Sequence, residues 1–81
     1  MLHPKVKEYI LESGEKEFLL YHIKQLSDDP YNKRAEADIK KLKGKKHTLY
    51  RLRIGIHRFE YFIDNDKIWI DNAFKRERGY R

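Results

Sequence analysis

The sequence predicts an α+β domain in which two short helices pack on one face of a three- to four-stranded antiparallel sheet. Apolar residues recur at three- and four-residue spacing in the first third of the chain, which is the period of a helix. From Leu49 onward they alternate with charged residues, which is the period of a half-buried strand. Because the helices precede the strands, they are expected to share one face of the sheet. The opposite face is then open for function.

Two helices are expected before residue 30. The first begins at Pro4, where a missing N–H is tolerated, and ends near Ser13 at a Ser-Gly pair. The second runs over 15–27 and stops at the Asp-Asp-Pro that follows, because the residue before a proline avoids helical geometry. We assign its apolar stripe, from Phe18 to Leu26, to the core.

The strands form a meander with short connections. Ile39 and Leu42, three residues apart, fit either a helical turn or a ragged strand. Gly55 makes one turn and Asn65-Asp66 a tight hairpin loop. A two-residue loop at that point predicts four facing pairs: Ile63 with Ile68, Tyr61 with Ile70, Phe62 with Trp69, and Glu60 with Asp71.

Length and composition indicate one small folded domain over residues 1–81. The chain is 14% aromatic, which is unlike a disordered basic tail. It has no cysteine, so disulfides and cysteine-ligated metals are excluded, and a cytoplasmic location is expected. No apolar run is long enough to span a membrane, and no signal peptide is recognisable.

One segment supplies the whole net charge of +6. Between Ile39 and Phe59 there are eight Lys and Arg residues and no Asp or Glu, whereas the flanking parts mix both signs. We call residues 39–59 the acid-free segment. It suggests a polyanionic partner such as nucleic acid; a solvated basic face without a partner is the alternative.

The residues point to phosphate chemistry without a metal. Arg51, Arg53 and Arg58 alternate with apolar residues and should converge on the open face, and arginines bind phosphate oxygens bidentately. The four histidines are scattered away from the acids, so no metal set is expected, and no cofactor motif is present. Metal-free cleavage suits RNA, whose own 2′-hydroxyl attacks the adjacent phosphate.

Several strings in the chain resemble the RelE/ParE toxin superfamily. They are His-Pro-Lys before the helix pair, Leu-Lys-Gly at 42–44, YRLRIGIHRFEY at 50–61 and Arg-Glu-Arg-Gly-Tyr at 76–80. The resemblance covers nearly the whole chain. It implies the toxin of a toxin–antitoxin pair, an endoribonuclease that cuts mRNA on the ribosome without a metal, with an acidic RelB-like antitoxin as partner.

The resemblance also implies roles for individual residues. It assigns phosphate binding and transition-state stabilisation to Arg51, Arg58 and Arg76, and base stacking or proton transfer to Tyr80. Arg53 stands where some members have a lysine proposed as general base. The residues implied in holding RNA are Lys40, Lys41, Lys43, Lys45, Lys46, Arg78 and Arg81.

Two departures from the superfamily pattern bear on these expectations. Members usually begin with a strand before the His-Pro-Lys string, and here only Met1-Leu2 precede it, so that strand is expected to be short or absent. An arginine at position 53 is a poor base because a guanidinium stays protonated in proteins. Glu60 is then either a substitute base or an ion-pair partner, and His57 is either an acid–base group or structural.

The departures keep a second function open. A ParE-like gyrase inhibitor, or a weakened toxin homologue that binds RNA or antitoxin without cutting, would not need a complete catalytic set. Trp69 and Phe62 are likewise open to two interpretations, as a stacking surface for nucleobases or as a cross-strand pair.

Overall fold

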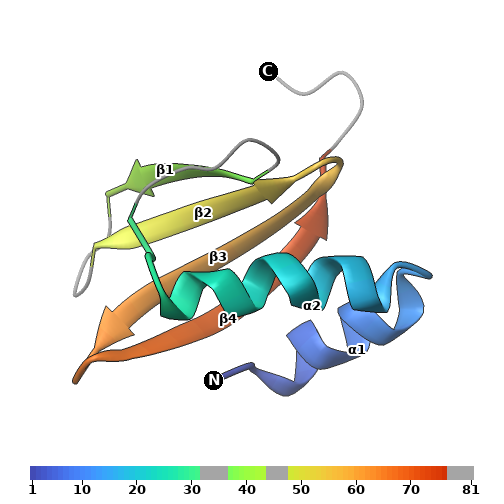
Figure 1. Cartoon of the computed structure of the whole chain (residues 1–81), viewed down its shortest axis with the longest axis horizontal. Coiled ribbons are helices and arrows are strands. Elements are labelled where there is room, and N and C mark those ends of the chain that lie inside the picture. Colours follow the sequence, from blue (N-terminus) through green and yellow to red (C-terminus); the bar gives the residue numbers. More distant parts are fainter. Residues whose placement is uncertain (32–36, 44–47, 77–81) are drawn as a thin grey trace.

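The computed structural model describes residues 1–31, 37–43 and 48–76. Two helices precede the strands (Figure 1). In chain order the elements are α1 (Pro4–Glu12), α2 (Lys16–Lys24), the 3-10 turn η1 (Gln25–Ser27), β1 (Asp38–Leu42), β2 (Leu49–Ile54), β3 (His57–Asp64) and β4 (Lys67–Lys75). The predicted α+β class is confirmed, and the ambiguous segment around Ile39 is a strand.

Local sequence signals set the ends of the helices. The imidazole Nδ1 of His3 accepts a hydrogen bond from the Lys5 N–H at 3.1 Å and caps α1, with Pro4 in the first turn. At the other end, Ser13 donates from its hydroxyl to the Ile10 carbonyl at 2.7 Å. Gly14 then has φ +78, a left-handed conformation that suits glycine and turns the chain into α2.

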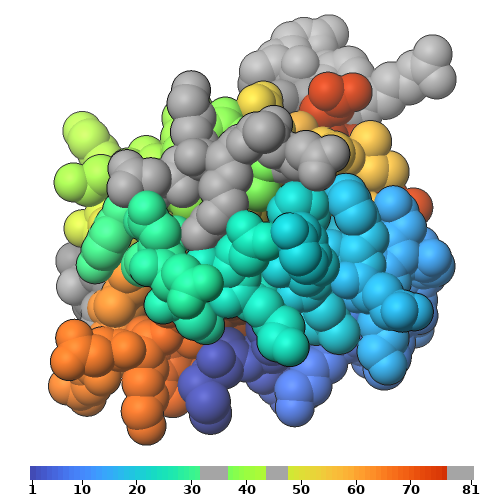
Figure 2. Space-filling model, in the orientation of Figure 1, coloured from blue at the N-terminus to red at the C-terminus, as the bar shows by residue number. Residues whose placement is uncertain are grey.

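The four strands form an antiparallel sheet in the order β1-β2-β3-β4. Both helices lie on one of its faces (Figure 1). In the same view the atoms of α1 and α2 cover part of the sheet, and the orange end of the β3–β4 hairpin stays visible beside them (Figure 2). The loop between β3 and β4 has positive φ at Asn65 and Asp66, as a type I′ hairpin requires. Three of the four predicted facing pairs are confirmed: Ile63 with Ile68, Tyr61 with Ile70, and Phe62 with Trp69.

The fourth pair is wrong, because the ladder shifts between Glu60 and Tyr61. Glu60 faces Asn72 and not Asp71. A β-bulge adds one residue to β4 at this point. The bulge replaces a facing pair of carboxylates with a carboxylate and an amide, and Asn72 donates from Nδ2 to Glu60 Oε1 at 3.1 Å.

The core lies between the helices and the sheet. Its buried members come from both layers: Val6, Ile10, Leu19, Leu26, Ala37, Leu52, Ile54, Phe59, Tyr61 and Ile70. Leu19 and Leu26 confirm the assignment of the second helix stripe to the core. Phe18 does not, because 43% of its surface is exposed, so that residue of the stripe was wrongly assigned.

The N-terminal residues add a stub to the sheet. Leu2 forms a parallel bridge with Ile70 of β4. The His3 N–H donates to the Ile70 carbonyl, and the Ile70 N–H donates to the Met1 carbonyl, each at 2.9 Å. This agrees with the expectation of a first strand that is short or absent.

Candidate functional site

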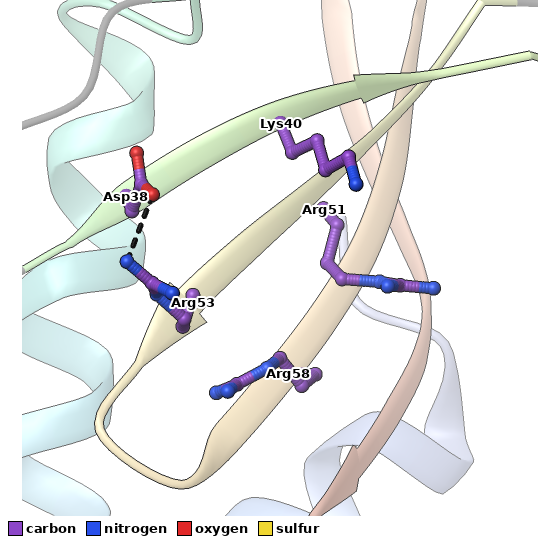
Figure 3. A pocket seen from close by; sticks show the side chains of 5 residues that line it. All are labelled: Asp38, Lys40, Arg51, Arg53 and Arg58. Atoms are coloured by element: carbon purple, nitrogen blue, oxygen red, sulfur yellow. Dashed lines mark hydrogen bonds and ion pairs between the residues drawn. The ribbon is translucent and has the colours of Figure 1, made fainter. Parts of the chain in front are cut away.

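The open face of the sheet gathers the three strand arginines. Side chains alternate along a strand, so Leu52 and Ile54 of β2 point to the helices while Arg51 and Arg53 point away. Arg58 of β3 is paired with Arg53 across the ladder and shares that face. Together with Asp38 and Lys40 of β1 they line a shallow cavity of about 170 Å³ (Figure 3). The predicted convergence of the three arginines is confirmed.

Arg58 is the most constrained of the three. Only 8% of its surface is exposed, and its Nη1 donates to the carbonyls of Gly55 at 2.7 Å and His57 at 3.0 Å. Burial lowers the pKa of Arg58 below its usual value, and the charges of Arg53, Arg76 and Arg51 lower it further. An arginine remains protonated in proteins despite such a shift. The lowered pKa therefore marks a crowded cationic site that an anion would stabilise.

Arg51 lies against polar and aromatic neighbours. Its Nη2 is 2.9 Å from Glu60 Oε2, with both side chains about a quarter exposed or less. The guanidinium carbon lies 5.5 Å from the centre of the Phe74 ring, within the range of a cation–π contact. Glu60 also accepts a hydrogen bond from Asn72. Its ion pair with Arg51 is the second of its two predicted roles, and the role as a substitute base stays a prediction.

Arg53 is more exposed and has a carboxylate of its own. Its Nη2 lies 2.9 Å from Asp38 Oδ2, and more than half of the arginine side chain is exposed. Asp38 was not predicted as part of the site. The sequence does contain a signal for it, since Asp38 directly precedes the acid-free segment. That signal becomes informative only once the β1–β2 register places Asp38 opposite Arg53.

The predicted RNA-binding lysines do not share one surface. Lys40 lies opposite Arg51 and lines the cavity, whereas Lys41 lies opposite Tyr50 on the helix side of β1. Lys43 is exposed just after β1. The remaining members of the predicted set, Lys45, Lys46, Arg78 and Arg81, lie outside the described residues, as does Tyr80.

Arg76 lies close to the three strand arginines. Its N–H donates to the Ile56 carbonyl at 2.7 Å, which holds the residue after β4 against the β2–β3 hairpin. Its charge contributes to the lowered pKa of Arg58. Four of the five residues predicted as catalytic are therefore neighbours, with Arg58 among them.

His57 is on the opposite face from Arg58. Only 2% of its surface is exposed, and its Nδ1 lies 2.7 Å from the Tyr9 hydroxyl. Its Nε2 lies 2.8 Å from Glu15 Oε2. The ring thus joins β3 to both helices, and of the two predicted roles the structural one fits this position.

Other features of the described residues limit the chemistry of the site. No three metal-ligating side chains among them lie close enough together to hold an ion. Phe62 and Trp69 pair across β3 and β4 on the arginine face, so the predicted cross-strand pair is confirmed. Stacking of a nucleobase on them stays a prediction. Neither described helix is long and apolar enough to cross a membrane.

Solved structures identify this architecture. No protein-family model and no curated protein matches the sequence. A chain of the archaeal RelE–RelB complex from Pyrococcus horikoshii OT3 has a TM-score of 0.75 and 28% identity, over 95% of this chain and 92% of that one. This protein has the RelE-type toxin fold.

A second solved structure has the same fold. It is the RelB–RelE antitoxin–toxin complex from Methanococcus jannaschii, with a TM-score of 0.70 and 18% identity over 94% of this chain and 90% of that one. Each of the two matches covers more than nine-tenths of this chain. It agrees with the resemblance drawn from the strings at 42–44 and 50–61.

Proposed function

We propose that this protein is the toxin of a toxin–antitoxin pair and that it cuts mRNA on the ribosome in the cytoplasm without a metal. The RelE-type fold supports the toxin assignment. The observation that carries the nuclease proposal is the buried guanidinium of Arg58, held by two carbonyls beside Arg51 and Arg53. A preorganised cation of this kind stabilises charge that develops on a phosphate in the transition state.

The partner in this proposal is an acidic, RelB-like antitoxin. The two solved structures named above are RelE–RelB complexes. The arginine face would attract acidic side chains as well as phosphates, so an antitoxin that covers this face would also block RNA. Formation of the complex would then switch off the activity by competition for the same cations.

A second candidate is a homologue that binds without cutting. Two of the three strand arginines already pair with carboxylates, and the structure leaves Glu60 paired and His57 on the opposite face. Glu60 and His57, the two acid–base candidates named from the sequence, thus both have other partners, which leaves the general base unassigned. A gyrase inhibitor or an RNA-binding homologue would need none.

Expression of the protein without an antitoxin separates these candidates. For the nuclease, Arg58→Ala should relieve growth arrest and slow ribosome-dependent mRNA cleavage by about 100-fold or more, because it removes a transition-state contact. Arg76→Ala should act in the same direction. Arg58→Lys keeps the charge but loses the planar fork, so it should be intermediate.

The matched control is Lys24→Ala, which removes an exposed cation from the helix side of the molecule. It should leave growth arrest and cleavage unchanged. Thermal unfolding of each variant shows whether the fold is intact. Growth arrest with intact mRNA and inhibited gyrase supercoiling would support the second candidate, and normal growth of cells expressing the wild type would reject the toxin assignment.

A further inference from the structure

A carboxylate stands at each end of the acid-free segment. Asp38 precedes it and Glu60 follows it. In the folded sheet each of these carboxylates lies beside an arginine of the acid-free segment, because Asp38 faces Arg53 and Glu60 faces Arg51 across neighbouring strands. Each carboxylate lies 2.9 Å from its arginine. The cations that dominate the sequence are thus partly neutralised in the folded molecule.

Arg58 is different from its two neighbours. Its guanidinium donates to main-chain carbonyls, and none of the carboxylates in the described ranges forms an ion pair with it. A carbonyl orients the guanidinium but leaves its full charge. Of the three strand arginines, Arg58 therefore has no described carboxylate to offset its charge, while Arg51 and Arg53 each have one beside them.

The two ion pairs should resist a competing phosphate to different degrees. Asp38–Arg53 is well exposed, with side chains 36% and 56% accessible, so solvent weakens it and a phosphate can replace the carboxylate easily. Glu60–Arg51 is less exposed and is held further by Asn72. In both places a phosphate that approaches the arginine also meets a carboxylate of its own sign.

We propose that Asp38 and Glu60 are specificity-determining residues that screen Arg53 and Arg51 from polyanions. Screening lowers the gain that an extended polyanion obtains from the flanking arginines, and it leaves the phosphate seated at Arg58 as the main electrostatic contact. The inference deepens the proposed function, since it rests on RNA being the partner of this face. It requires neither cleavage nor the ribosome.

Binding of a short fluorescent oligouridine, followed by anisotropy across a salt titration, tests the proposal. Asp38→Asn and Glu60→Gln each remove a negative charge while keeping the size of the side chain. Each should raise affinity about two- to five-fold at moderate salt, the range expected for loss of a competing surface ion pair. Each should also steepen the slope of log K against log salt by about 0.7, as for one more phosphate contact on a single strand.

Glu8→Gln is the matched control, because it removes the same charge from an exposed position on α1. It should change affinity less and leave the salt slope as in the wild type. A double-mutant cycle then isolates one pair: Arg53→Ala should cost more affinity in the Asp38→Asn background than in the wild type. Equal costs in both backgrounds would overturn screening by Asp38.

A fall in affinity in either carboxylate variant, or a change no larger than that of Glu8→Gln, would also overturn the proposal. The carboxylates would then orient the arginines for RNA, or have no effect on binding. Failure of the proposed function gives a different result. Suppose that the wild-type protein leaves mRNA on the ribosome intact, while the Asp38→Asn and Glu60→Gln variants bind oligouridine more tightly. The nuclease proposal is then rejected, and the proposal that the carboxylates screen the arginines stands.

Discussion

At the scale of single residues, the site is tied to the core through one peptide unit. Arg58 and His57 are adjacent and point to opposite faces, and the His57 carbonyl accepts a hydrogen bond from the Arg58 guanidinium. The His57 ring in turn contacts Tyr9 of α1 and Glu15 at the start of α2. The helices therefore help to fix the backbone on which the central arginine is held.

The Tyr9 phenol should make the free energy of unfolding depend on pH in the alkaline range. Burial, and then the nearby charge of Glu15, raise the pKa of Tyr9 above its usual 10.0. Folding thus favours the neutral phenol, and this contribution is complete below pH 10 and is lost as the pH rises through the pKa of the folded state.

Urea unfolding of the wild type and Tyr9→Phe at several pH values measures this effect. Near pH 8 the variant should be less stable by about 1 kcal/mol, the usual contribution of one hydrogen bond. The difference should shrink as the pH rises from about 9 to 11, because only the wild type has this phenol to ionise. A difference that stays constant over that range would show that Tyr9 titrates alike in both states.

At the scale of elements, alternation in the sequence predicted which face each strand residue would occupy. It placed Arg51, Arg53 and Arg58 on the open face, and the structure agrees. It could not predict the bulge opposite Glu60, because an extra residue in one strand leaves no mark on the local pattern. The pairing of Asp38 with Arg53 was equally hidden, since the period of β1 was ambiguous.

The β3–β4 hairpin loop offers a stabilising change. Asn65 and Asp66 have φ +51 and +61, and a type I′ turn favours glycine at the second position. Asp66→Gly should therefore raise the free energy of unfolding by about 0.5–1 kcal/mol and the melting temperature by a few degrees. Calorimetric unfolding measures both quantities.

Gly55 provides the opposite change for comparison. It has φ +59, and no atom lies within 4 Å of the place that a Cβ would occupy, so any cost is one of backbone conformation. Gly55→Ala should lower the free energy of unfolding by about 1–2 kcal/mol. If Asp66→Gly destabilised the protein as Gly55→Ala does, the loop would not behave as a type I′ turn.

At the scale of the whole molecule, a thin core supports the arginine face. The described helices cover one side of the sheet, so the buried apolar residues form a single layer between the helices and the sheet. A domain of this size has a stability of roughly 4–12 kcal/mol. One large core side chain is thus a considerable part of the total.

Phe59 makes this dependence measurable, because it is fully buried beside Tyr9. Phe59→Ala should lower the free energy of unfolding by about 3–5 kcal/mol, through lost burial and the cavity left behind. Urea unfolding followed by circular dichroism gives the value. Leu11→Ala, at an exposed position on α1, is the control and should change stability by less than about 0.5 kcal/mol.

The sequence predicted the charge of the molecule better than its distribution. Residues 39–59 are indeed the source of the net charge. The described members of this segment, however, do not form one uniform cationic surface. Lys40 and Lys41 lie on opposite faces of β1. The carboxylates of Asp38 and Glu60 form ion pairs with Arg53 and Arg51. These are consequences of strand register, which composition does not contain.

The bulge in β4 also changes which of the residues that follow it face the helices. Before it, Ile70 faces the helices; after it, one additional residue restores Ala73 to that side and keeps Asn72 and Phe74 with the arginines. Without the bulge, a regular ladder would place Asn72 opposite Phe59 and Phe74 opposite His57. One inserted residue thus decides which residues in the second half of β4 face the helices and which face the arginines.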